Sequence, residues 1–181
     1  MSAVDVPPAS VAARTCSVRR AAAADRPALE RMLARCTGQT RYRRFHGPVK
    51  VFPERYLAEA LPGSPLHLAL VAYLADDAAV DGPVVDGPVV DGTVVALASC
   101  RAVDEGVAEL GILVEDEWQR RGVGSHLLRE IVAYAAGTGL RALQAQVLAD
   151  QPWIVGLLRH HGTCTVAGAG QALHVTLSLP R

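Results

Sequence analysis

Hydrophobic and polar residues follow two different periods along this chain, and each period predicts one type of element. Apolar runs of strand length predict β-strands at residues 18–20, 66–74, 93–103, 107–114, 140–148, 163–167 and 172–179. Leu29, Met32, Leu33 and Cys36 recur at helical spacing. They predict a helix that Asp25 caps, with Pro27 in its first turn and Gly38 as its stop. Further helices are expected at 53–61, from 123 to the glycine at 137, and at 151–161. The order predicts a mixed α/β layer with one sheet.

Composition narrows the class of protein. The chain has 181 residues, 50% of them hydrophobic, and equal numbers of acidic and basic side chains give it a formal net charge of zero. A nucleic-acid binder driven by bulk positive charge is therefore not expected, although the short basic and aromatic stretch 41–46 leaves that alternative open. Since no apolar run approaches the roughly 20 residues that span a bilayer, no membrane partner is expected either.

The domain organisation follows from the same pattern. Residues 1–16 lack an apolar signal core and are expected to form a flexible leader, and 17–181 a single domain in the cytoplasm. Four widely spaced cysteines favour buried thiols over a disulfide or zinc framework, so no metal is expected. The repeat Asp-Gly-Pro-Val-Val, which recurs with one change between Asp81 and Val95, predicts an extended hairpin tip at 81–92.

The segment 109–125 carries the strongest functional signal. An apolar strand runs into the turn Gln119-Arg120-Arg121-Gly122-Val123-Gly124, which opens a helix. Unpaired backbone N–H groups and a partial positive charge make a helix N-terminus suitable for phosphate. Gly122 and Gly124 permit close approach to the backbone, and two arginines add charge. Position 127 is leucine, which excludes the dinucleotide fingerprint, and Gly-Lys-Ser/Thr is absent. An ordinary strand-to-helix turn with surface arginines is the alternative.

The Gln-x-x-Gly-x-Gly loop and the order of elements resemble the GCN5-related N-acetyltransferases (GNAT) over about residues 17–180. The stretches 41–48, 108–109 with 118–119, and 147–149 resemble most the acetyltransferase domain of bacterial protein-lysine acetyltransferases. The resemblance implies a central, mostly antiparallel sheet of six to seven strands flanked by about four helices. It also implies transfer of an acyl group from acetyl-CoA, or another short acyl-CoA, to an amine.

The resemblance assigns cofactor contacts to matching positions. The backbone near Leu113 and Val114 would hold the pantetheine arm, and Gln151 lies where relatives carry an asparagine that touches the cofactor. The backbone amides of a single run would hold the pyrophosphate: Gln119, Arg120, Arg121, Gly122, Val123, Gly124 and Ser125.

Glu109 is the candidate general base. An alkylamine with a pKa of about 10.4 arrives protonated, so something must take its proton before it can attack. Glu109 stands within an apolar strand and shares a face with Gly111 and Leu113. Partial burial raises the pKa of a carboxyl group and suits a base, and the related enzymes place their catalytic glutamate at this position. A glutamate in water at the strand edge is the alternative.

The chain departs from the family pattern at its last helix. Leu158 stands where relatives carry the tyrosine that protonates the leaving thiolate, and Gly162-Thr163 replaces a Gly-Phe pair. A thiol pKa of about 8.5 makes the thiolate a tolerable leaving group without an acid. The acidic run 115–117 is expected to be a solvated loop and Trp153 to be buried.

Three functional alternatives remain. The acceptor is a protein lysine, slightly favoured, or a small amine. In the third alternative, the missing tyrosine marks a non-catalytic acyl-CoA-binding sensor or interaction module. A homodimer is left open.

Overall fold

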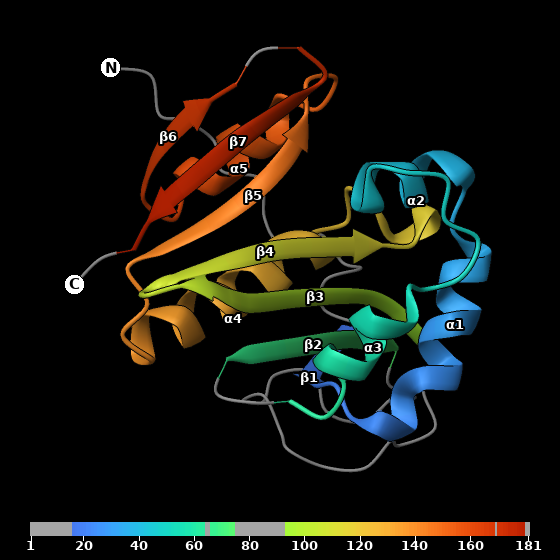
Figure 1. Ribbon diagram of the computed structural model, residues 1–181. Coiled ribbons are helices and arrows are strands. Elements are labelled where there is room, and N and C mark those ends of the chain that lie inside the picture. The colour runs from blue at the N-terminus through green and yellow to red at the C-terminus, as the bar shows by residue number, and fades with distance from the viewer. Residues whose placement is uncertain (1–15, 64–65, 75–92, 169, 180–181) are drawn as a thin grey trace, which may run out of the picture.

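The computed structural model describes residues 16–63, 66–74, 93–168 and 170–179. One seven-stranded sheet organises them, in the order β1-β2-β3-β4-β5-β7-β6 (Figure 1). Its strands are β1 (Cys16–Arg20), β2 (His67–Leu74), β3 (Thr93–Asp104), β4 (Val107–Val114), β5 (Ala142–Leu148), β6 (Thr163–Ala167) and β7 (Ala172–Ser178). This confirms the predicted mostly antiparallel sheet. β1 begins at the last residue of the expected leader, and the predicted hairpin tip at 81–92 lies outside the described residues.

Helices cover both faces of the sheet. They are α1 (Arg26–Arg35), α2 (Gly38–Phe45), α3 (Glu54–Ala60), α4 (Val123–Gly137) and α5 (Trp153–Arg159), with short 3-10 turns at Ala23–Asp25 and Asp116–Trp118. One core cluster joins α4 and α5 to the sheet through Leu127, Ile131 and Leu158. A second joins α1 and α3 to the other face through Leu29, Leu57 and Leu113. The alternation of side chains along β4 therefore sends its residues into two different cores.

Only one neighbouring pair of strands is parallel. β4 and β5 pair at Val107↔Ala142, Ala108↔Leu143 and Glu109↔Gln144, and α4 makes the crossover that a parallel pair requires. Beyond Glu109, β4 continues along β3 while β5 continues along β7. The two strands diverge from that point and open a wedge in the sheet (Figure 1). We call this opening the β4–β5 wedge.

Helix α2 was not predicted. Gly38 was predicted to stop the first helix, but it is the first residue of α2. The Thr37 side chain accepts a hydrogen bond from the Thr40 amide at 3.2 Å and thus caps the new helix. The chain turns between α1 and α2 at Cys36, whose backbone is extended. The signal in the sequence was the Thr37-Gly38 pair, in which the threonine marks a start rather than the glycine a stop.

Asp25 does not cap α1 as predicted. It stands at the N-cap position, but its side chain makes no capping bond to that helix. Its carboxylate instead accepts two hydrogen bonds from Arg19, at 2.7 and 2.6 Å, and one from the Ala22 amide at 2.8 Å. Asp25 therefore ties the start of the helical region to β1.

Candidate active site

The backbone of β4 borders the wedge with alternate residues. The Glu115 amide donates to the Val95 carbonyl on β3 at 3.0 Å. Since backbone polar groups alternate sides along a strand, Leu113 also points its polar groups to β3, whereas Ile112 and Val114 point theirs toward the wedge. The backbone of Val114 therefore borders the wedge, whereas the backbone of Leu113 faces β3. The second residue that directs its backbone groups toward the wedge is Ile112.

The loop at 119–124 enters α4 with an unusual backbone. Arg120 and Gly122 have positive φ angles of 58° and 87°, and Gly122 is the N-cap. Among the residues that the structure describes, no side chain caps α4, so its first-turn N–H groups are available to a ligand. A Cβ built at Gly124 would meet only Val114 Cγ2, at 3.6 Å, so packing within the protein does not demand glycine there. The arrangement suits an anion at the start of α4.

The other residues of the loop have distinct positions. The side-chain amide of Gln119 donates to the Val114 carbonyl at 3.0 Å and to Thr40 Oγ1 at 3.1 Å. Gln119 therefore fixes the loop against β4 and α2. The guanidinium of Arg121 lies over the Trp118 ring, 5.3 Å from its centroid. Arg120 and Ser125 are exposed, whereas the Val123 side chain is buried in the core.

The acidic run before the loop is not a solvated segment, as was predicted, except at Glu117. Glu115 is buried and forms an ion pair with Arg35, with both bonds at 2.8 Å. Asp116 accepts bonds from Thr37 and Thr40 at 2.7–2.8 Å. Burial alone would raise the pKa of the Asp116 carboxyl, but these bonds hold it below its usual value. Glu115 and Asp116 therefore join the end of β4 to α1 and α2.

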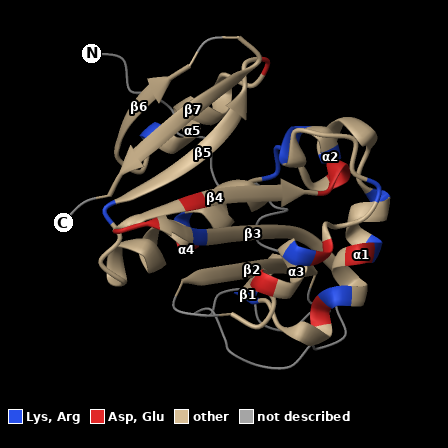
Figure 2. Cartoon of the chain, viewed as in Figure 1, with Lys and Arg blue, Asp and Glu red and all other residues tan. Residues whose placement is uncertain are grey.

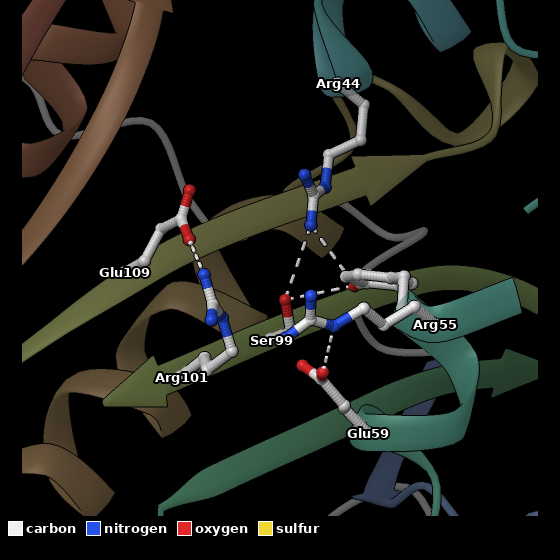
Figure 3. A network of polar contacts seen from close by, with 7 residues as sticks. Arg44, Arg55, Glu59, Ser99, Arg101 and Glu109 are labelled. Carbon is white, nitrogen blue, oxygen red and sulfur yellow. Dashed lines mark hydrogen bonds and ion pairs between the residues drawn. The ribbon is translucent and has the colours of Figure 1, made fainter. Parts of the chain in front are cut away.

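Glu109 lies at the apex of the β4–β5 wedge, in the last residue pair that joins the two strands. The expectation that its side chain is partly buried is wrong, because 53% of it is exposed. Its Oε2 accepts a hydrogen bond from Arg101, its cross-strand neighbour on β3, at 2.8 Å (Figure 3). The exposed carboxylate is accessible to an amine or a water, so its accessibility does not depend on a conformational change.

A second polar group lies further along the same face. Arg44, from α2, donates to the Tyr56 hydroxyl at 3.1 Å and to Ser99 Oγ at 3.4 Å, and the Tyr56 hydroxyl donates to Ser99 Oγ at 3.0 Å (Figure 3). Ser99 pairs with Gly111 across β3 and β4, directly beside the pair Arg101↔Glu109. None of these three side chains, Arg44, Ser99 and Arg101, was predicted to lie in the site. The alternation in β3 placed Ser99 and Arg101 on one face, which was the available signal.

A cavity of about 510 Å³ lies between α2 and the end of β5, lined by Gln39, Tyr42, Arg43, Leu148, Ala149, Asp150, Gly170 and Gln171. Arg43 forms an ion pair with Asp150 at 3.0 Å. Nδ1 of His46 forms a hydrogen bond of 3.0 Å with Oε1 of Gln146. These contacts connect α2 to β5 on the far side of the wedge. Pockets of this size accommodate small organic ligands.

The last helix corrects one expectation. Leu158 is buried in the core, and its hydrocarbon side chain carries no acidic proton. Trp153 is exposed rather than buried. Gln151 is buried in the turn before α5, where its backbone N–H donates to the Leu148 carbonyl at 2.9 Å. A Cβ at Gly162 would overlap the Ser178 carbonyl oxygen, so the close approach of β7 requires glycine there.

The remaining chemistry of the described residues is limited. All four cysteines are free, and burial raises the pKa of Cys16, Cys36 and Cys100 to about 11. No group of three His, Cys, Asp or Glu in the described ranges could hold a metal ion. Within the same ranges, the helices are all too short or too polar to cross a membrane. Figure 2 shows charged residues on α1, α2 and α3, whereas β5, β6 and β7 carry almost none.

Comparison with known protein families identifies the family of this chain. The model of the Acetyltransferase (GNAT) family matches residues 54–162, so the chain belongs to this family. No curated protein sequence matches the chain.

Three solved structures illustrate the shared fold. The GNAT domain of PAT from S. lividans has a TM-score of 0.73 at 20% identity, with 91% of this chain and 90% of that chain covered. A GCN5-related N-acetyltransferase from Kribbella flavida has a TM-score of 0.65 at 23% identity, covering 90% and 96%. A ribosomal-protein-alanine N-acetyltransferase from Escherichia coli has a TM-score of 0.60 at 19% identity, covering 91% and 93%. At these identities the structures show the fold alone.

Proposed function

We propose that this protein transfers an acyl group, normally acetyl, from acyl-CoA to a primary amine. The observation that carries the proposal is the β4–β5 wedge, which opens at Glu109 and meets the uncapped start of α4. The wedge offers the backbone groups of Ile112 and the amide of Val114, and the helix start offers N–H groups for phosphates. Membership of the GNAT family supports the same reaction.

The residues of the chain fit acyl-CoA as the co-substrate. The amides from Gln119 to Ser125 would hold the pyrophosphate, with Gly124 leaving room for it, and Val114 and Ile112 would hold the pantetheine arm. Gln151 would contact the cofactor from the β5 side. Bound in this way, acyl-CoA supplies a thioester, whose carbonyl carbon is the electrophile of the reaction.

Glu109 removes the proton that makes the acceptor amine non-nucleophilic. Its Oε2 is held by Arg101, and Oε1 takes the proton directly or through one water. The C–N bond to the acyl carbon then forms and the C–S bond breaks. Leucine at position 158 has no acidic proton to give, but the thiol pKa of about 8.5 lets the thiolate leave and gain its proton from water.

The nature of the acceptor is the finer part of the proposal. A protein lysine and a small amine both fit the reaction, and the acceptors named for proteins of this fold differ. The exposure of Glu109 is compatible with either. A non-catalytic acyl-CoA sensor remains the rival of another class, since it needs the cofactor site but not the base.

The first test is calorimetric titration of the wild-type protein with acetyl-CoA and with CoA, compared with the same titrations of the Gly124→Glu variant. A side chain at position 124 clears Val114, and a carboxylate in the first turn of α4 is favourable for the helix, so the variant is expected to fold. Its charge opposes the pyrophosphate, and we expect affinity to fall about tenfold or more. Absence of binding to folded wild-type protein would overturn both the enzyme and the sensor.

A further inference from the structure

The guanidinium of Arg44 is held firmly but has only neutral partners. It donates to the hydroxyls of Tyr56 and Ser99. Its central carbon lies 5.0 Å from the ring centroid of Phe45 and 5.2 Å from that of Tyr56. Phe45 and Tyr56 also pack edge to face, with centroids 5.9 Å apart. Among the described residues no carboxylate pairs with this half-buried cation, and an anion would be a better partner than any it has.

Gly111 is what allows Arg44 to reach the sheet. A Cβ at position 111 would overlap the guanidinium of Arg44, so the absence of a side chain on β4 makes the space that the cation fills. Gly111 lies two residues from Glu109 on the same face of β4. At the rise of an extended strand this places the two positions about 7 Å apart. The proposed base and an uncompensated cation therefore border the same patch of the sheet.

We propose that the acceptor is an amino acid, whose carboxylate binds Arg44 while its amine faces Glu109. The inference rests on the proposed function, because Glu109 marks where the amine reacts. Arginine matches a carboxylate with two parallel N–H···O bonds. In an amino acid the amine and the carboxylate are a few bonds apart. With one hydrogen bond of about 3 Å at each end, such a molecule spans the interval between Glu109 and Arg44. Arg101 is held by Glu109, whereas Arg44 has no carboxylate partner among the described residues and is available to the substrate.

The test compares amino acids with the amines that lack only the carboxylate: tyrosine with tyramine, histidine with histamine, and tryptophan with tryptamine. For wild-type protein we expect kcat/KM to favour the amino acids by about tenfold to a hundredfold, the value of a charged hydrogen-bonded pair. Arg44→Gln should collapse this ratio, chiefly by raising KM for the amino acids. Gly111→Ala should reduce it too, because the new methyl group displaces the guanidinium without removing it.

The matched control is Arg55→Gln. Arg55 is on the neighbouring helix α3 (Figure 3), where it pairs with Glu59 at 2.6 Å and 87% of its side chain is exposed. This variant makes the same change of charge without touching the patch, and the amino-acid preference should survive. Thermal unfolding of every variant checks that loss of the ratio is not loss of fold.

A binding measurement separates this inference from the proposed function. The CoA-loaded protein is titrated with N-acetyltyrosine and with N-acetyltyramine, in wild type and in Arg44→Gln. Tighter binding of N-acetyltyrosine that needs Arg44, without turnover of any amine, rejects the enzyme but keeps the carboxylate site. Equal binding of the two compounds overturns the inference. So does turnover in which the amines, or an end-blocked lysine peptide without carboxylates, match the amino acids.

Discussion

Two arginine–carboxylate pairs in this protein look alike in distance and differ in every other respect. Arg19 and Asp25 meet at 2.6 Å, with 5% and 0% of their side chains exposed. Arg101 and Glu109 meet at 2.8 Å, with 44% and 53% exposed. The first pair fastens the helical region to β1, and the second stands at the apex of the β4–β5 wedge. Burial decides which pair serves the fold and which is accessible to a substrate.

The electrostatics of the buried pair follow from its bonds. Burial alone would raise the pKa of the Asp25 carboxyl, but hydrogen bonds from Arg19 and from the Ala22 amide outweigh it and hold that pKa below its usual value. A carboxylate whose pKa is lowered in this way is a weaker base. The exposed pair leaves an oxygen of Glu109 accessible to solvent, which a base requires.

The largest effect should come from Glu109→Gln. The amide keeps the shape and a hydrogen-bond acceptor for Arg101 but cannot take a proton, so we expect kcat to fall by about 10²–10⁴-fold. Acetyl-CoA affinity, measured by calorimetry, should be unchanged because the cofactor loop is untouched. Normal turnover in the variant would show that Glu109 is not the base. No turnover in either protein, with acyl-CoA bound by both, would favour the sensor.

Asp25→Asn tests the structural role of the buried pair. The change leaves Arg19 buried without a counter-charge, and we expect a loss of about 3–5 kcal/mol in the free energy of unfolding. Urea unfolding measures it, and kcat per folded molecule should stay at the wild-type value. A loss below about 1 kcal/mol would mean that the pair is solvated in the folded protein.

His67 links stability to pH beside the exposed pair. It is buried and faces Arg101 across β2 and β3. Burial first, and then the charge of Arg101, lower the pKa of His67. The unfolded chain therefore binds the proton more readily, so stability should fall as the pH drops below about 6.5 toward the folded pKa.

Urea unfolding between about pH 7.5 and about pH 5.5 measures this dependence, with His67→Gln as the control. The decline should be smaller than the loss in Asp25→Asn. It should be less steep in the control, which retains the contribution of His161, whose pKa burial also lowers. An identical decline in both proteins would assign the effect to other groups.

The smallest effect is expected for Arg101→Gln. Exposed ion pairs contribute about 0–1 kcal/mol, so stability should change within that range, and less at high salt. Measuring urea unfolding at low and high salt checks both statements. A loss of unfolding free energy as large as that of Asp25→Asn would show that the exposed pair is as important to the fold as the buried one.

The sequence predicted the frame of the fold because its strands are short and strongly apolar. β4 and β6 have the predicted bounds, and the strand–turn–helix around Gly122 was found from its glycines. Helix α2 was missed because its start depends on a threonine cap and on Asp116, which is distant in sequence. Trp153 was misplaced because burial of a helical residue depends on which neighbours cover it.

The site was predicted in part. Backbone roles at the loop could be assigned from glycine positions, but the choice between Leu113 and Ile112 depends on which carbonyls face β3. The exposure of Glu109 and the position of Arg44 depend on tertiary contacts among α2, α3 and β3. No local pattern encodes such contacts, since the partners are separated by as many as 55 positions.

Three residue pairs join β4 to β5, so the sheet consists of two panels, β1 to β4 and β5 to β6, that meet at a short seam. Each panel has continuous antiparallel ladders, while the seam has few hydrogen bonds to hold it and should open at a lower free energy than either panel. A ligand that contacts Val114 in one panel and Gln151 beside the other would hold the two panels together across the seam. Slowed amide exchange in both panels would then report binding, even at residues that the ligand never touches.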